Sequence, residues 1–286
     1  MNDVTLLTYI SLAIALVVGV LAADTRIRFM REFAFGFSGV SIVLFIFVGL
    51  LTLYTSILLF ALLITGYYLK FIKNKLLYNC LFVICGLFSL LLAIHIIPGI
   101  ENVLLYENVT ISENAQTITL YANFDKGIAG VVLLLLISSR SLSSMSLLKY
   151  WLLIPLILLT LFLLALTSGL NWEPKWPAFT LEFFLVNLLL TCIAEEAFFR
   201  GCIQQRLSQA ITRHTKNGSV LALCLTSLLF GLAHFNGGAQ LVVLAILAGL
   251  GYGIIYKLTG KLSTAIAVHF GLNALHFTLL TYPIPL

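Results

Sequence analysis

The chain has 286 residues, of which 61% are hydrophobic and 9% charged, whereas a soluble domain carries roughly a quarter charged residues. Runs of about 20 apolar residues recur along it, and each can cross a hydrocarbon layer as a helix, which excludes a soluble globular protein and an open sheet. The net charge of +5 arises from short basic clusters between apolar runs, as topology signals do, so we expect a lipid bilayer as partner and no nucleic acid. The predicted fold class is all-α, a polytopic transmembrane helical bundle.

The predicted membrane spans are apolar runs of helical length. About ten are expected, with a range of about eight to ten that depends on dividing 33–69 into two helices and on the short run 127–139. The N-terminus lacks the basic segment of a cleavable signal peptide, so the first run is expected to be retained as a span. In chain order, the runs are 4–23, 33–51, 53–69, 76–97, 127–139, 150–169, 178–200, 219–236, 239–256 and 262–283.

The distribution of basic residues predicts the orientation of the bundle. With the N-terminus outside, only Lys126 and Lys175 fall in outward connections, and an even number of spans then places the C-terminus outside as well. The longest outward connection, 98–126, is predicted to be a turn followed by an extended surface segment. The fourteen basic residues expected inside are Arg26, Arg28, Arg31, Lys70, Lys73, Lys75, Arg140, Lys149, Arg200, Arg206, Arg213, Lys216, Lys257 and Lys261.

Glu195 and Glu196 are adjacent carboxylates inside an apolar run. At membrane depth, ionised carboxylates cost several kcal/mol unless they are paired or hydrated, so they are candidate functional groups. On a helix, Arg200 can pair with Glu196 four residues earlier, while Glu195 points about 100° away, toward a cavity. Because neighbouring carboxylates repel, one is expected to have a raised pKa, suited to accepting a proton near neutral pH. The alternative is a structural Glu196–Arg200 pair, with Glu195 reaching the inner surface.

Two polar stripes follow in later apolar runs. Phe230 and His234, and likewise His269 and Asn273, are four residues apart, so each pair lies on one face of a helix. A single buried histidine is more often a packing residue than a catalyst. Two histidines and an asparagine on separate helices, in the same stretch of chain as a buried acid pair, instead favour a site inside the bundle. His276 is interpreted as a supporting or packing residue.

The motifs Glu-Glu-x-x-x-Arg, Phe-x-x-x-His and His-x-x-x-Asn follow one another in this order, each within an apolar run. Together they resemble the CAAX protease and bacteriocin-processing family of intramembrane glutamic proteases, the type II CAAX prenyl endopeptidase-like group. The resemblance covers about residues 178–283. It implies a catalytic helical core over 178–286, preceded by transmembrane helices over 1–177 whose role it does not indicate.

The resemblance also implies catalytic roles. Glu195 would be the general base that activates water, His234 would orient that water, and His269 and Asn273 would bind the developing oxyanion. Peptide hydrolysis needs a base within about 3 Å of a water and donors aimed at the tetrahedral oxygen, which suits this division. Three supporting residues would orient the acid pair or line the cavity wall: Glu196, Arg200 and Phe230.

A zinc ion is the other way to build hydrolysis from these side chains. Glu195, His234 and His269 could supply three ligands and leave a fourth position open. The sequence has no His-Glu-x-x-His helix, and no nearby carboxylate stands out as a separate base. We therefore favour the metal-free glutamate mechanism and expect no cofactor.

The span map raises a conflict in depth. If 178–200 is one crossing that ends inside, Glu195 lies near the inner surface and His234 near the outer one, roughly 15–20 Å away in depth. The conflict disappears if the helix is longer, because the following stretch has no proline and a helix stop comes only at Asn217-Gly218. We predict one helix from about 180 to 214. Three residues near its end are then expected to line a wet cavity open to the cytoplasm: Gln204, Gln205 and Arg206.

The leading hypothesis is an integral membrane endopeptidase that acts on membrane-associated proteins or peptides. The small size and the lack of targeting extensions favour a bacterial inner membrane. A proton- or ion-coupled transporter would use the buried acids as a relay, but it predicts a repeated half that the sequence does not show. A non-catalytic bacteriocin-immunity or scaffold protein of the same fold would be favoured by degraded motifs, whereas every catalytic position is intact here.

Overall fold

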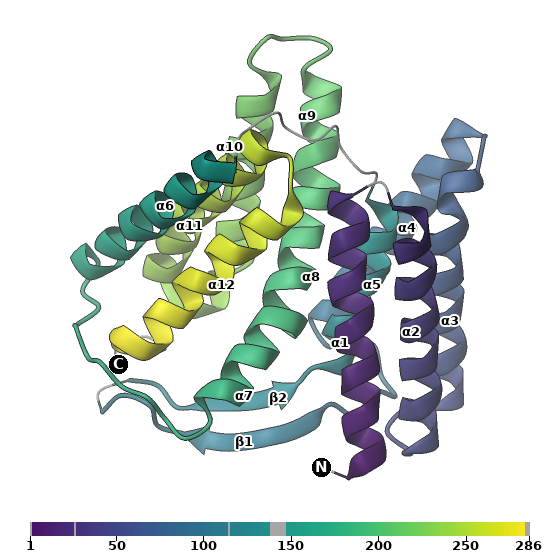
Figure 1. The fold of residues 1–286 in the computed structure, drawn as a ribbon, viewed down its shortest axis with the longest axis horizontal. Coiled ribbons are helices and arrows are strands. Elements are labelled where there is room, and N and C mark those ends of the chain that lie inside the picture. The colour runs from purple at the N-terminus through teal and green to yellow at the C-terminus, as the bar shows by residue number, and fades with distance from the viewer. Residues whose placement is uncertain (1, 26, 114, 138–146, 284–286) are drawn as a thin grey trace. The chain divides into compact units, whose positions relative to one another are not determined.

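The structure is a computed structural model that describes residues 2–25, 27–113, 115–137 and 147–283. Its elements divide into two compact units (Figure 1). Unit 1 comprises Met1–Val103, Tyr121–Arg140 and Leu189–Cys202, and unit 2 comprises Leu104–Leu120, Ser141–Leu188 and Ile203–Leu286. Two residues expected on the inner side, Arg26 and Arg140, and the end of the run 127–139 lie outside the described residues.

Unit 1 is a helical bundle around one buried helix, α5 (Phe124–Leu136). Apart from Lys126, every residue of α5 is buried, because the helix beyond Asp125 and Lys126 is apolar on all faces. The helices that pack against α5 are α1 (Asp3–Asp24), α2 (Arg28–Phe47), α3 (Leu53–Tyr68), α4 (Lys75–Ala93) and α8 (Ile193–Glu196).

Glycines of α5 bring three parallel helices into close contact. A Cβ atom added at Gly130 would lie 3.1 Å from Leu16 of α1 and 3.2 Å from Cβ of Ala194. These contacts place Ala194 level with the middle of α1. Residue numbers increase in the same direction along all three helices, so α1, α5 and segment 189–202 are parallel. One turn earlier, Gly127 lies in the same way against Leu12 and Leu190.

Replacing Gly130 with valine is expected to destabilise unit 1 by about 1–3 kcal/mol, because the added carbons have no space between Leu16 and Ala194. Thermal unfolding in detergent measures this effect. Gly86 of α4 is the matched control, since a Cβ atom added there meets nothing within 4 Å, so Gly86→Val should change the unfolding temperature little. Equal effects of the two substitutions would contradict the close packing of α5.

Unit 2 combines apolar helices with a β-hairpin. In this unit, α11 (Gly238–Thr259) packs against α6 (Leu147–Thr167), α10 (Gly218–Leu232) and α12 (Leu262–Leu279), and α10 also packs against α9 (Gln205–Ile211). The connection predicted to be extended, 98–126, forms the strands β1 (Val103–Val109) and β2 (Ile118–Ala122). The fold is therefore mostly helical, in agreement with the predicted all-α membrane class, and the hairpin lies in the connection that was predicted to be extended.

An aromatic cluster holds the hairpin in unit 2. Phe179, Phe183 and Phe277 are buried together with Leu120 of β2. The rings of Phe183 and Phe277 stack with their centroids 3.9 Å apart, and Tyr106 of β1 lies 4.6 Å from Phe179. The cluster thus joins the hairpin to the start of α7 (Thr180–Leu185) and the end of α12.

Within the described ranges, six helices are long and apolar enough to cross a membrane, and two apolar helices are shorter. The predicted division of 33–69 is confirmed by α2 and α3. Ten spans are not confirmed. One reason is α5, whose 13 residues give a helix of only about 20 Å. The six are Asp3–Asp24, Phe29–Phe47, Leu53–Phe71, Lys75–Ala93, Phe235–Thr259 and Leu262–Leu279, and the shorter two are Leu152–Thr167 and Gly218–Leu232.

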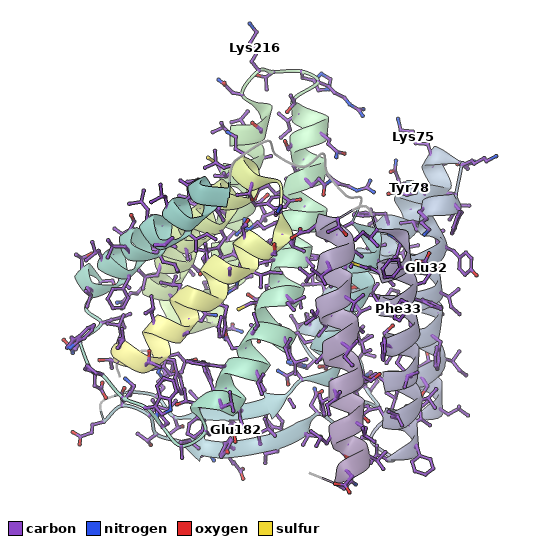
Figure 2. The ribbon with its side chains drawn as sticks, viewed as in Figure 1. Glu32, Phe33, Lys75, Tyr78, Glu182 and Lys216 are labelled. Carbon is purple, nitrogen blue, oxygen red and sulfur yellow. The ribbon has the colours of Figure 1, made fainter. Side chains whose placement is uncertain are left out.

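The chain is helical without interruption from Thr180 to Ile211, which confirms the predicted long helix. Two π-helical segments, Val186–Cys192 and Ala197–Gln204, flank the four residues of α8. The sequence did not predict these π-helical segments. Such segments are rare in proteins, and those that occur are often at functional sites. Figure 2 shows Glu182 and Lys216 at opposite ends of unit 2. Glu182 lies in the first turn of the long helix, and Lys216 follows its last residue, Ile211, by five positions.

Candidate active site

Glu196 and Arg200 form the predicted ion pair in unit 1. Arg200 Nε donates to Glu196 Oε2 at 3.0 Å, and both side chains are 0% exposed. A buried charge is stable only when it is paired, so each of these residues depends on the other. The enclosure of both side chains fits the supporting role that was predicted for them.

Glu195 pairs with a lysine that the sequence analysis assigned to an outward connection. Lys126 Nζ donates to Glu195 Oε1 at 2.8 Å, and the two side chains are 16% and 20% exposed, respectively. The sequence analysis expected Glu195 to face a cavity and gave it no cation. The sequence showed only that Lys126 stands at the start of an apolar run. It did not indicate that Lys126 would contact Glu195, which lies 69 positions later in the chain.

The depth of Glu195 in unit 1 follows from the register of its helix. The preceding residue, Ala194, meets Gly130 at the level of Leu16, near the middle of α1. α1 is one of the helices long enough to cross a membrane. Because the helix continues to Ile211, Glu195 does not lie at the end of a crossing, as the run 178–200 alone would have placed it.

His234 follows the end of α10 in unit 2. Its Nδ1 lies 2.8 Å from the carbonyl oxygen of Phe230. Because a carbonyl oxygen can only accept, Nδ1 carries a proton, so that in the neutral form of the ring Nε2 has a lone pair. A nitrogen in this state can accept a hydrogen bond from water, which the predicted role of His234 requires.

His269 lies between two aromatic rings of unit 2. It stacks on Tyr252, with ring centroids 4.5 Å apart, and meets Phe230 nearly at a right angle at 5.7 Å. Phe230 also contacts His234 at 4.7 Å, so its ring touches both histidines. Phe230 is 2% exposed and acts as a packing residue beside both of them. Sequence reasoning missed Tyr252, because an aromatic residue in an apolar run gives no signal of its own.

Asn273 is oriented by a second asparagine. Its Nδ2 donates to Asn187 Oδ1 at 3.1 Å. Asn187 lies in the π-helical segment Val186–Cys192, and the sequence analysis gave it no role. The signal that could have found it is an amide inside an apolar run, since a buried amide is stable only when it is hydrogen-bonded.

Gln204 and Gln205 do not line a wet cavity, so that prediction is wrong. They are 3% and 5% exposed. Gln204 Nε2 donates to the carbonyl of Gly253 at 3.1 Å, and the Tyr256 hydroxyl donates to Gln205 Oε1 at 3.2 Å. These bonds to α11 satisfy both amides, and they attach the end of the long helix within unit 2.

In the part of the chain that the structure describes, no group of three or more His, Cys, Asp or Glu side chains is placed to hold a metal ion. Of the alternative zinc ligands, Glu195 belongs to unit 1, and His234 and His269 belong to unit 2. The ammonium of Lys126 lies 2.8 Å from Oε1 of Glu195. Its positive charge opposes binding of a divalent cation at this oxygen.

Residues 177–275 match a protein-family model described as type II CAAX prenyl endopeptidase Rce1-like. The match contains every residue that the three motifs singled out, from Glu195 to Asn273. This segment is similar to Rce1-like domains. The predicted resemblance is thereby confirmed, and with the apolar helices it identifies an integral membrane protein with a protease-family domain. A search among curated proteins and a search among solved structures each found no match.

The Rce1-like segment covers about a third of the chain and takes parts of both units. From unit 1 it includes Leu189–Cys202, which carries the acid pair, whereas α1–α5 precede it. The Lys126–Glu195 contact therefore joins a residue of the Rce1-like segment to a residue outside it.

Proposed function

We propose that this protein is an intramembrane endopeptidase that hydrolyses membrane-associated proteins or peptides, with Glu195 as the general base. The observation that carries the proposal is the order of three intact motifs inside an Rce1-like segment. We also propose that this enzyme lies in a bacterial inner membrane, with both termini outside and the active site accessible from the cytoplasm. This orientation places most basic residues of the connections between helices on the inner side.

In the proposed reaction, Glu195 removes a proton from water while the water oxygen attacks the carbonyl carbon of the peptide bond. The carbonyl π electrons move to oxygen, and donors on His269 and Asn273 stabilise the negative charge. When the intermediate collapses, the C–N bond breaks and Glu195 returns the proton to the leaving nitrogen. His234 orients the water through Nε2, and the bond from its Nδ1 to Phe230 supports this role.

The reaction is proposed to need no metal. A zinc ion on Glu195 would stand beside the Lys126 ammonium, whose repulsion opposes binding of a divalent cation. With Lys126 in place, the carboxylate is instead held ionised, the state in which a glutamate can accept a proton.

Replacing Asn273 with aspartate is expected to lower kcat about 10²–10³-fold, because it removes the N–H donors and adds a negative charge where the oxyanion forms. Purified protein in detergent, with a chelator present, is incubated with a membrane-anchored peptide, and the fragments are identified by mass spectrometry. Asn217→Asp, the same substitution at an exposed residue of unit 2, should leave cleavage unchanged. Full activity of the Asn273 variant would contradict its oxyanion role, and activity that requires added zinc would overturn the metal-free mechanism.

A further inference from the structure

Lys126 lies at a position where a positive charge without a counter-ion would be unfavourable. It is the one residue of α5 that is not buried, and it lies in the first turn of a helix that is apolar apart from Lys126 and Asp125. The positive end of the helix dipole and the loss of solvent both oppose an ammonium at this position. Its side chain, only 16% exposed, ends 2.8 Å from Glu195 Oε1. The attraction to this carboxylate offsets the unfavourable placement.

The neighbouring acid, Asp125, is engaged elsewhere. Its carboxylate lies 2.7 Å from His95 Nδ1 and accepts the backbone N–H of Lys126 at 2.7 Å. Glu196 in turn has Arg200 as its partner. Each of these three carboxylates in unit 1 therefore has its own nitrogen partner, and the side chain of Lys126 serves Glu195.

This pairing changes the electrostatics expected for two adjacent acids. From the sequence alone, repulsion between Glu195 and Glu196 is predicted to favour protonation of one of them. In the structure, Lys126 and Arg200 each place a positive charge beside one carboxylate, which offsets the repulsion. Within unit 1, Asp125 and its partner His95 are titratable groups next to Lys126, and the ring of Tyr9 lies beside Phe124 at the start of α5.

The position of Lys126 relative to Glu195 is set by the packing of two backbones. Gly130 of α5 touches Ala194, and a Cβ atom added at Gly201 would meet Ile137 at 2.2 Å. Contacts on both sides of Glu195 thus keep α5 against the helix that carries it. Because α5 is buried on all other faces, it cannot shift without disturbing the whole of unit 1.

We propose that Lys126 is a positioning residue for the proposed hydrolysis: its ammonium holds Glu195 ionised and fixes the orientation of the carboxylate through Oε1. The inference rests on the proposed function. It also gives the helices that precede the Rce1-like segment a role, because α5 supplies a residue on which the catalytic base depends.

The test compares the dependence of kcat/KM on pH for Lys126→Met and Lys126→Arg with that of the wild type, between about pH 5 and pH 9. Without the ammonium, protonation of Glu195 becomes easier, so the acid limb should move to higher pH by about one to three units. Below the new midpoint the rate should fall about tenfold for each pH unit, and it should recover toward alkaline pH. Lys126→Arg keeps the charge and should keep the profile of the wild type.

The matched control is Lys70→Met, which removes the lysine of another Lys–Glu pair in unit 1 and should leave the profile unchanged. A wild-type profile for Lys126→Met would overturn the inference, and so would an equal loss of activity at every pH. If Lys126→Met does not fold, the inference expects Lys126→Met/Glu195→Gln to fold, because the unpaired charge is gone; failure of this double variant would also overturn it. Full activity of Glu195→Gln would instead defeat the proposed function itself.

Discussion

Glu195→Gln is expected to lower the rate of peptide hydrolysis about 10²–10⁴-fold, the range that general-base catalysis contributes. Glutamine has nearly the same shape as glutamate, and its amide oxygen can still accept the hydrogen bond from Lys126 Nζ. It cannot take a proton from water, so the variant isolates the chemical role of the carboxylate. Because the side-chain volume is preserved, the packing of Ala194 against α5 should be retained.

Hydrolysis in ¹⁸O-labelled water measures the effect directly, since each cleavage places one labelled oxygen in the new carboxylate. Glu182→Gln is the matched control, because Glu182 is an exposed glutamate at the start of the same long helix. Its rate should equal that of the wild type. If Glu195→Gln releases labelled product as fast as the Glu182 variant does, Glu195 is not the base.

The second large effect concerns the buried pair of Glu196 and Arg200. Either Glu196→Gln or Arg200→Met alone is expected to lower the free energy of unfolding by about 3–5 kcal/mol, because each leaves the opposite charge buried without its counter-ion. Both side chains are 0% exposed, so solvent cannot replace the missing partner. The loss should appear in unfolding of the detergent-solubilised protein by denaturant.

The double variant Glu196→Leu/Arg200→Met provides the control for this prediction. With both charges replaced by apolar side chains, it should be more stable than either single variant. Glu32→Gln removes one partner of an exposed pair, Lys70–Glu32, and should cost at most about 1 kcal/mol. Single variants of the buried pair that unfold like Glu32→Gln would contradict the assignment of a tightly buried ion pair.

Local features of this protein were predictable from its sequence. The division of 33–69 into α2 and α3 was predictable from helix length, and the predicted run 53–69 nearly matches α3, whereas α2 begins and ends four to five residues before the predicted run 33–51. The Glu196–Arg200 pair was also predictable, since residues four apart meet on any helix. The long helix from Thr180 to Ile211 followed from the absence of proline in this stretch.

Contacts between helices were not predictable. Sequence spacing does not indicate that Lys126 meets Glu195, that Asn187 meets Asn273, or that Tyr252 stacks on His269. The burial of Gln204 and Gln205 was likewise predicted wrongly, because their partners lie on α11, about fifty residues later in the chain.

Composition and local spacing by themselves determined that this is a helical membrane protein with one acid pair, two histidines and an asparagine in family order. Only the tertiary structure decided which cation serves each acid and which rings hold His269. The physical reason is that lipid is as apolar as leucine, so an apolar helix face can meet either lipid or protein. Leu152 is 63% exposed and Leu133 is 2% exposed, yet both lie in similar leucine-rich runs. Their difference arises from packing, which the pattern of apolar residues does not encode.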